Sequence, residues 1–437
     1  MKKTALLIIA LFITSASFAQ GLLSLFNRSD EFFKLMQDKK FNEAHAFFDP
    51  VAQTKISTAD LEKLWVDLDT KLGKFESSEP VQNKVQGDLF VVTVEGKFAY
   101  TTQNFTLAFN KAEKLVGFFV QPPSNTQNYL NPAYADTTLY SQKEIYIKSP
   151  GHSLVGILTA PKNSTNYPLV VLVHGNGPND MDATVGPNKP FKDLAAGLAS
   201  KGIASIRYVK RTMIYQGEFA GAFTVKEETI DDAVAAIALA RTTPGVDKKQ
   251  IYLLGHSLGG TLAPRIAALA PDLNGVIIAE ATSRKFTDLL VEQNKYMFDQ
   301  AKDTTQLLKK EFDTLLTALN KSRITTAGTM KPDSLILGLP VSYWVDLNLY
   351  NQVEAAKNIK QRILIIQGEN DFEVTVNDYN LWKSGLSSKS NATFKLYPDL
   401  NHLLSSQLEK GNQRQYQAAS SVSESLIIDI VNWIKSK

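Results

Sequence analysis

The chain has 437 residues and contains no cysteine. This absence excludes disulfide bonds, thiol catalysis, lipid attachment through cysteine and zinc sites built from cysteine. An excess of one charge is also missing, since 47 Lys and Arg stand against 44 Asp and Glu for a formal net charge of +3. Two of these positive charges, Lys2 and Lys3, lie in a segment expected to be removed, which leaves +1. This balance does not call for nucleic acid or an acidic membrane surface as a partner.

Long apolar runs are missing as well, and the one apolar run near the start of the chain is short. Residues 1–19 carry two lysines directly after Met1, continue with an apolar run over 5–13 and end with the small residues Ser17 and Ala19. This layout predicts a secretory signal peptide cleaved after Ala19. The run is too short to span a membrane comfortably. We therefore expect an exported protein, periplasmic or extracellular, with no membrane span in the mature chain and an oligomeric state that the sequence leaves open.

The length of the chain exceeds what one ordinary core needs and predicts two domains, or one large domain with additions. Residues 20–121 combine amphipathic helical patterns with alternating strand-like runs, which predicts a small α+β domain. Residues 122–137 are rich in Pro, Asn and polar residues without periodicity, so they are expected to form a linker. Residues 138–437 form the second predicted domain, in which helical patterns at about 285–356 interrupt the rhythm of strands and predict a lid.

The second domain alternates short aliphatic runs with helical patterns. The runs "PLVVLV", "IASIRYV", "IYLLG", "NGVIIA" and "RILIIQG" are nearly continuously apolar. Strands buried on both faces have this composition, as in a parallel sheet covered by helices. The alternation predicts an α/β fold with a doubly wound, mostly parallel sheet.

The tetrapeptide "GHSL" occurs twice, around Ser153 and around Ser257. A serine nucleophile at the top of such a sheet sits in a sharp strand-to-helix turn, which requires small residues two positions before and two after it. Ser257 has Gly255 and Gly259 at these positions and lies between an apolar run and a helical pattern. Ser153 is followed two positions later by Val155 and then by another strand pattern. Ser257 is the predicted nucleophile, and the other serine is predicted to be a hairpin-turn residue.

The chain has only five histidines that could serve as the base. His45 lies in the other domain, His152 adjoins the rejected turn, and His174 ends a strand where a structural role is expected. His256 is the direct neighbour of the nucleophile and points away from it. His402 follows the last strand-like run and precedes the final helix, so it is the predicted general base.

The acid that orients this base is expected between Ser257 and His402 at the end of a strand. The stretch "RILIIQGENDFEV" offers Asp371, which follows a turn in a pattern typical of this position. Glu369 and Glu373 are interpreted as solvated loop charges. Asp399, three residues before the histidine, is a weaker rival for the role.

Two backbone N–H groups are required to stabilise an oxyanion. Leu258, directly after the nucleophile, is expected to supply one. The loop "HGNGPND" is expected to supply the other from Asn176, with Gly177 as the fallback. Gly177 is also a candidate for substrate binding. Tyr343 and Trp344 in the lid are further candidates for a substrate pocket.

Together, "HGNGPND", "GHSLGG", "LGLPVSYWVDLNLY", "ILIIQGENDFEV" and "LNH" resemble bacterial carboxylesterases of the α/β-hydrolase superfamily. These are related to serine aminopeptidase-like and dienelactone-hydrolase-like groups, and one subset carries a small N-terminal domain of unknown function. The resemblance implies an α/β-hydrolase fold with a helical lid. It also implies a triad of Ser257, Asp371 and His402 with oxyanion donors at Asn176 and Leu258.

The resulting functional hypothesis is a serine hydrolase that cleaves small-molecule carboxylic esters through an acyl-enzyme on Ser257. No cofactor and no metal are expected. Two alternatives remain open at this point: a serine peptidase or thioesterase that uses the same triad, and a non-catalytic binding module on a hydrolase fold.

Overall fold

The structure is a computed structural model and divides into two compact units, residues 1–125 and 126–437. The described residues are 25–86, 89–121, 129–301 and 307–436. The predicted signal peptide, 1–19, lies outside them, as does part of the predicted linker. In the described part of that linker, the Tyr129 and Tyr134 hydroxyls donate to the Asp193 carboxylate and the Val422 carbonyl of the second unit, both at 2.7 Å.

The first unit packs helices against a four-stranded antiparallel sheet of order β1-β2-β3-β4. A helix covers residues 25–37, and the rest of the unit consists of α2 (Phe41–His45), α3 (Pro50–Gln53), α4 (Thr58–Leu72), β1 (Phe75–Gln86), β2 (Leu89–Phe98), β3 (Thr102–Phe109) and β4 (Leu115–Val120). The α4 helix begins with a capping box, in which the side chains of Ser57 and Asp60 bond each other's backbone N–H. The predicted α+β architecture is thus present.

Aromatic side chains fill the core of this unit. Phe33, at the centre, has ring neighbours at centroid distances from 4.9 Å to Phe105 up to 6.2 Å to Trp65. All three side chains are at most 1% exposed. Aromatic rings bury a large apolar area for each ordered residue, so a unit of this size can hold its own core.

The second unit is built on an eight-stranded sheet of order β14-β13-β10-β9-β7-β8-β6-β5. Its strands are β5 (Tyr140–Ser149), β6 (His152–Pro161), β7 (Tyr167–Val173), β8 (Ala204–Tyr208), β9 (Val246–His256), β10 (Gly275–Ala279), β13 (Arg362–Gly368) and β14 (Ala392–Tyr397). The β5–β6 and β6–β8 pairs are antiparallel and the others are parallel. The predicted α/β-hydrolase fold, with its mostly parallel sheet, is confirmed.

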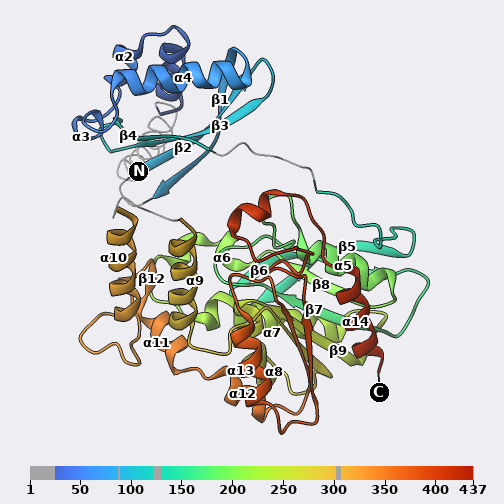
Figure 1. Cartoon of the computed structure of the whole chain (residues 1–437). Coiled ribbons are helices and arrows are strands. Elements are labelled where there is room, and N and C mark those ends of the chain that lie inside the picture. Colours follow the sequence, from blue (N-terminus) through green and yellow to red (C-terminus); the bar gives the residue numbers. More distant parts are fainter. Residues whose placement is uncertain (1–24, 87–88, 122–128, 302–306, 437) are drawn as a thin grey trace, which may run out of the picture. The chain divides into compact units, whose positions relative to one another are not determined.

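Helices cover both faces of this sheet (Figure 1). On one face lie α5 (Pro190–Ser200) and α14 (Glu424–Lys435), and on the other lie α7 (Asp231–Thr242), α8 (Leu258–Leu269), α12 (Gln352–Asn358) and α13 (Val376–Gly385). The central strand β7 shows why its sequence is continuously apolar. Leu169, Val171 and Val173 enter one core while Val170 and Leu172 enter the other, and all five are 0% exposed.

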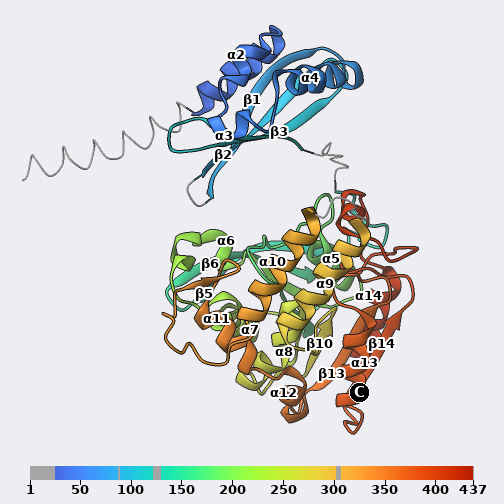
Figure 2. The same cartoon turned by 60° about the vertical axis from the view of Figure 1, so that its left-hand side comes forward.

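An insertion between β10 and β13 corresponds to the segment predicted as a lid. It contains α9 (Phe286–Ala301), α10 (Leu307–Lys321), β11 (Leu335–Ile336), β12 (Leu339–Pro340), α11 (Val341–Leu349) and α12. The α9 and α10 helices run side by side (Figure 2), and the rings of Phe298 and Phe312 stack between them at 4.7 Å.

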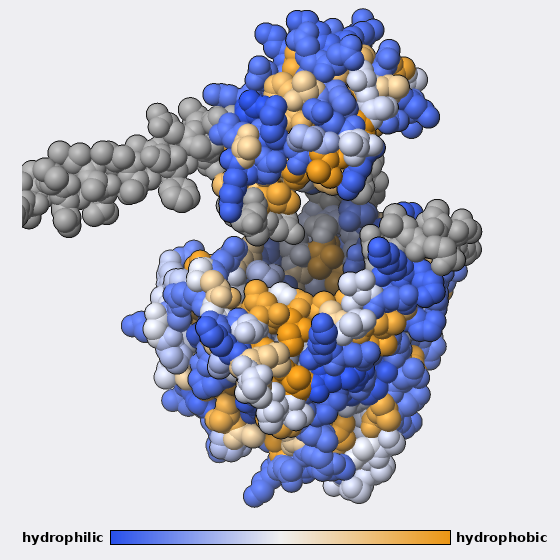
Figure 3. All heavy atoms as spheres, turned by 90° about the vertical axis from the view of Figure 1, so that its left-hand side faces the viewer, coloured by the Kyte–Doolittle hydropathy of each residue, from blue (hydrophilic) through white to orange (hydrophobic). Residues whose placement is uncertain are grey.

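The insertion also exposes apolar side chains. Met330, Leu335 and Leu337 are 39%, 62% and 41% exposed, respectively. Seen from the side that carries α9 and α10, the second unit shows apolar residues gathered among hydrophilic ones (Figure 3).

Short elements complete the second unit and surround the edge where the parallel strands end. They are α6 (Arg211–Ile214), η1 (Gln216–Ala220), the π-helical turn η2 (Lys226–Ile230) and η3 (Gln413–Gln417). Because the carboxyl ends of parallel strands meet at one edge of the sheet, residues that follow β7, β9, β10, β13 and β14 are brought together there. None of the described helices combines the length and the apolar character that crossing a membrane requires.

Candidate active site

Ser257 occupies a sharp turn between β9 and α8. Its backbone has φ 55° and ψ −121°, a conformation that a residue with a side chain rarely adopts. A Cβ on Gly255 would lie 2.2 Å from the carbonyl oxygen of Gly259, and a Cβ on Gly259 would lie 2.4 Å from that of Val173. The two glycines are therefore required by the close approach of backbone segments. Ser153, in contrast, is exposed and pairs with Lys148 in the β5–β6 hairpin.

Asp371 and His402 come together from two different loops at the ends of β13 and β14. The Nδ1 of His402 lies 2.7 Å from Oδ2 of Asp371. Since a carboxylate can only accept, Nδ1 carries the proton and Nε2 is left as the acceptor. The backbone N–H groups of Glu373 and Val374 donate to Oδ1 of Asp371 at 2.6 and 2.9 Å. A Cβ on Gly368 would lie 2.2 Å from a carbonyl of the histidine loop, so this glycine lets the two loops approach.

Both members of this pair are buried, Asp371 at 0% and His402 at 5% exposure. Burial alone would raise the pKa of Asp371, but the charge and hydrogen bond of His402 outweigh it and lower that pKa. For His402, burial opposes the charged ring, whereas the Asp371 and Glu373 carboxylates favour it and raise its pKa to about 9. The pair is arranged to stabilise an imidazolium.

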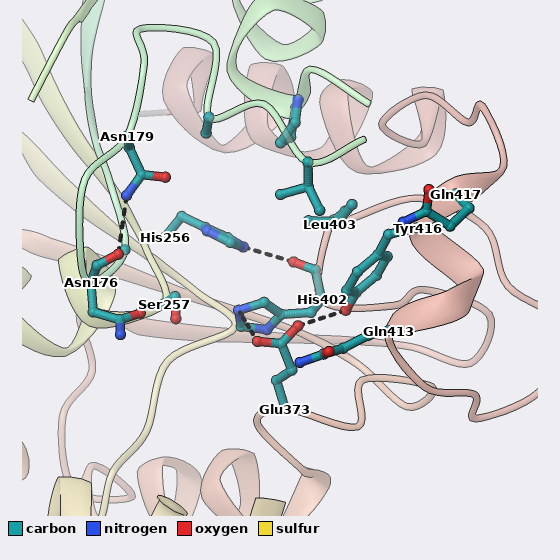
Figure 4. Close-up of a pocket in the computed structure, with 14 residues that line it drawn as sticks. Asn176, Asn179, His256, Ser257, Glu373, His402, Leu403, Gln413, Tyr416 and Gln417 are labelled. Carbon is teal, nitrogen blue, oxygen red and sulfur yellow. Dashed lines mark hydrogen bonds and ion pairs between the residues drawn. The ribbon is translucent and has the colours of Figure 1, made fainter. Parts of the chain in front are cut away.

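A pocket of about 390 Å³ joins Ser257 to His402, and Asn176 and Glu373 also line it. Figure 4 shows these side chains around the pocket. His256, the neighbour of Ser257, is turned the other way, and its Nε2 donates to the carbonyl of His402 at 2.7 Å. Burial lowers the pKa of His256 to about 3, so this ring is neutral and acts as a donor that holds the His402 loop.

The loop after β7 brings Asn176 to the same pocket, but it commits Gly177 elsewhere. The N–H of Gly177 donates to Oε1 of Glu228 at 2.8 Å. This amide is therefore already paired, which argues against the fallback role considered for it. Lys210 donates to the carbonyl of Gly175 and to Glu228, each at 2.7 Å, so a buried ion pair anchors the loop.

Glu373 requires a correction of the sequence interpretation. The sequence predicts a solvated loop charge at this position, yet the Glu373 side chain is only 31% exposed and its Oε2 lies 3.8 Å from Nε2 of His402. The hydroxyl of Tyr416 donates to its Oε1 at 2.8 Å. The sequence does not reveal this environment of Glu373, because its partner Tyr416 comes from η3, 43 residues further along the chain. Glu369 and Asp399 are exposed, and Asp399 accepts from Ser406 instead.

The chain is similar in sequence to a known esterase. Over 419 residues the chain is 31% identical to Esterase EstD of Thermotoga maritima, an alignment that covers 92% of this chain and 93% of EstD. The chain belongs to the EstD esterase family. Membership in this family assigns it to the carboxylesterase-type hydrolases. Residues 29–118 match the model of a family described as a protein of unknown function, DUF3887.

Solved structures similar to this EstD-family chain are more distant. Est1E from Butyrivibrio proteoclasticus is 14% identical, with a TM-score of 0.44, and the match covers 67% of this chain and 99% of Est1E. An acylaminoacyl peptidase from Pyrococcus horikoshii is also 14% identical, with a TM-score of 0.45. That match covers 74% of this chain and 52% of the peptidase, so the chain spans about half of it.

A second cavity of this EstD-family protein, about 500 Å³ in volume, shares Asn176 with the first. Gly177 and Tyr343 line it together with the apolar side chains of Phe219 and Phe223. The Tyr343 hydroxyl donates to Oε2 of Glu228 at 2.6 Å and thus also supports the loop after β7. Trp344 lines neither of these two cavities, is 1% exposed and donates its indole N–H to the carbonyl of Ile336.

Sequence reasoning missed Glu280 altogether. It follows β10 directly, is 0% exposed and lies beside Asp371 and His402, with one side-chain donor or acceptor atom of each of the three within 4.8 Å of the others. The available signal was a carboxylate at the end of the apolar run "NGVIIAE", where a buried strand meets the edge of the sheet that carries the site.

Proposed function

We propose that this EstD-family protein hydrolyses small-molecule carboxylic esters through an acyl-enzyme formed on Ser257. The observation that carries the proposal is one shared pocket. It holds a serine in a strained turn and a buried histidine whose Nδ1 is fixed by Asp371 at 2.7 Å. This arrangement leaves the Nε2 of His402 on the pocket side as the only basic atom of the ring.

In the proposed reaction, Oγ of Ser257 attacks the ester carbonyl carbon while Nε2 of His402 takes the hydroxyl proton. The negative charge that develops on the carbonyl oxygen is met by the N–H groups of Asn176 and Leu258. The C–O bond to the alcohol then breaks, and the alcohol leaves with the proton held by His402. Water, deprotonated by the same nitrogen, attacks the acyl-enzyme and releases the acid and the free serine. Asp371 stabilises the imidazolium in both halves.

Two cavities share Asn176, and this arrangement supports the proposal that the acyl and alcohol halves of an ester bind in different cavities. One cavity, about 390 Å³, adjoins His402, and the other, about 500 Å³, has the apolar side chains of Phe219 and Phe223 in its wall. An acyl group and an alcohol diverge from the carbonyl carbon, and the carbonyl oxygen points to the oxyanion donors. A site with room on both sides of Asn176 fits this shape.

Covalent labelling tests the nucleophile. A fluorophosphonate forms an O–P bond with an activated serine and releases fluoride, which adds one label to the intact mass. We expect labelling of the wild type and of Ser153→Ala and none of Ser257→Ala. An unlabelled wild type would favour a binding module on this fold.

The class of substrate is tested separately, by comparing kcat/KM on p-nitrophenyl esters with kcat/KM on matched anilides and thioesters. Higher values on the anilides would favour the peptidase, and higher values on the thioesters would favour the thioesterase.

The charge of Glu373 predicts a shift in the pH profile. His402 must be neutral to accept a proton, so kcat/KM is expected to rise with pH until the ring is deprotonated, near pH 9. Glu373→Gln removes one of the two carboxylates that stabilise the charged ring and is expected to move this acidic limb to lower pH. A partly exposed pair contributes up to about 1 kcal/mol, which corresponds to a shift of somewhat under one pH unit.

The matched control for this pH profile is Glu369→Gln. Glu369 is exposed, lies four residues before Glu373 and follows the same strand, so its removal is expected to leave the acidic limb in place. The measurement is kcat/KM for p-nitrophenyl acetate between pH 5 and about 10. Equal limbs for Glu373→Gln and the wild type would mean that the carboxylate does not act on His402.

A further inference from the structure

Glu280 occupies a strained and fully buried position at the edge of the sheet that carries the site. It directly follows β10, has φ 48° and is 0% exposed. Its Oε1 accepts from the N–H of Gly368 at 2.8 Å, and its Oε2 accepts from the side-chain amide of Gln367. A non-glycine residue at positive φ is strained, so the surrounding fold holds this carboxyl in place against that strain.

The Glu280 carboxyl faces the carboxyl of Asp371. The two buried carboxyls have oxygen atoms within 4.8 Å of each other. Two buried carboxylates this close cannot both be charged, so one proton is held between them. Asp371 is the charged member, because the N–H groups of Glu373 and Val374 and the Nδ1–H of His402 all donate to it. The proton therefore resides on Glu280, which leaves that side chain with an O–H group to donate.

The groups around Glu280 agree with this assignment. Burial raises the pKa of Glu280 well above its ordinary value, and the charge of Asp371 and the hydrogen bond between the two carboxyls raise it further. Among the described residues, the other titratable neighbours of this pair are His402, whose Nδ1–H donates to Asp371, and His256, which burial keeps neutral. Tyr416 also lies near, and burial together with the charges of Glu373 and Asp371 raises the pKa of its hydroxyl. The single positive charge that His402 can carry is already matched by Asp371.

We propose that Glu280 is a positioning residue that stays protonated and donates a hydrogen bond to Asp371, and thereby weakens the pull of this carboxylate on His402. The proposal rests on the proposed role of Asp371 and His402 in ester hydrolysis. Negative charge on Asp371 is then shared among its donors, with the O–H of Glu280 added to the Nδ1–H of His402 and the N–H groups of Glu373 and Val374. Without the first donor, Asp371 holds the proton of His402 more tightly, and the base becomes neutral only at higher pH.

The pH dependence of kcat/KM tests this coupling with two variants. Glu280→Gln keeps a donor toward Asp371 and an acceptor for the N–H of Gly368, so we expect its acidic limb to lie within a few tenths of a pH unit of the wild type. Glu280→Met keeps the volume but removes the donor, and its limb is expected at higher pH. A Glu280→Gln limb at lower pH would overturn the proposal, because it would mean that Glu280 carried a negative charge.

Folding stability gives a second readout that does not depend on catalysis. Unfolded Glu280 ionises above its ordinary pKa of 4.5, whereas the folded protein retains this proton. Folding therefore takes up one proton above that pH. As pH rises, the free energy of unfolding of the wild type falls more steeply than that of Glu280→Gln, and the difference in slope corresponds to one proton. Denaturant unfolding between pH 6 and about 9 measures this difference. Parallel curves for the two proteins would overturn the proposal.

Failure of Glu280→Met to fold leaves Glu280→Gln and the stability slope to decide. Persistent ester hydrolysis by Ser257→Ala would remove the proposed reaction but would leave the proton count of Glu280 measurable. Glu280, Asp371 and His402 could also hold a metal ion. Loss of activity on dialysis against EDTA, restored by Zn²⁺, would therefore overturn the proposal in favour of a metal site.

Discussion

Replacing Ser257 by alanine is expected to lower kcat for p-nitrophenyl ester hydrolysis by about 10⁴- to 10⁶-fold, as removal of a triad nucleophile does elsewhere. The loss should fall on kcat, because alanine removes the only atom that forms the acyl bond and leaves the walls of the pocket intact. The backbone of Ser257, with φ 55°, is held by the packing of the turn and not by its hydroxyl. Initial rates across acyl chain lengths, with KM determined separately, measure this effect.

Ser153→Ala is the matched control, because Ser153 stands in the same tetrapeptide. It is exposed and paired with Lys148 in the β5–β6 hairpin, so its replacement is expected to change the rate less than twofold. The Kd of Ser257→Ala for a non-hydrolysable ester analogue should stay close to the Kd of the wild type. An unchanged rate in Ser257→Ala would contradict the proposed nucleophile and would favour the binding module.

The turn around Ser257 could be predicted because its constraint is local. Gly255 and Gly259 stand at fixed positions on either side of the serine, and backbone atoms lie where their side chains would be. The strands could be predicted for a similar reason. A run such as Leu169–Val173 must be apolar at every position, because consecutive side chains enter two different cores.

Glu280 and Glu373 could not be assigned in the same way, since their surroundings come from distant segments. Glu280 meets Gly368, 88 residues away, and Glu373 meets Tyr416, 43 residues away. The local sequence around a single carboxylate does not show whether its side chain is solvated or buried. The decision lies in which loops meet at the end of the sheet, and this depends on strand order and not on local pattern.

Tyr343 shows a similar limit in the insertion. Its aromatic character predicted a place in a substrate pocket, and it does line the second cavity. Its hydroxyl, however, donates to Glu228, which also accepts from the N–H of Gly177 and from Lys210. The insertion thus supports the loop that carries Asn176, a link that only the three-dimensional arrangement of η2 and α11 makes visible.

Replacing Asp371 by asparagine is expected to lower kcat by about 10⁴-fold while the protein remains folded, the size of loss seen when a triad carboxylate becomes an amide. The asparagine can offer its NH₂ group to Nδ1 of His402, which stabilises the tautomer with the proton on Nε2. That nitrogen then cannot accept the proton of Ser257. Removal of the negative charge also lowers the pKa of His402 from about 9, so the residual activity should reach its plateau at lower pH.

Asp399→Asn is the control that separates the two candidate acids. Asp399 lies three residues before His402, is exposed and accepts from Ser406, so its replacement is expected to leave kcat within about twofold of the wild type, as for most exposed substitutions. A large loss in Asp399→Asn together with an active Asp371→Asn would reverse the assignment. An intermediate loss in Asp371→Asn, by 10- to about 100-fold, would mean that Glu280 loses its proton and supplies the missing charge. In that case the acidic limb would stay near its wild-type position, because a carboxylate would still face His402.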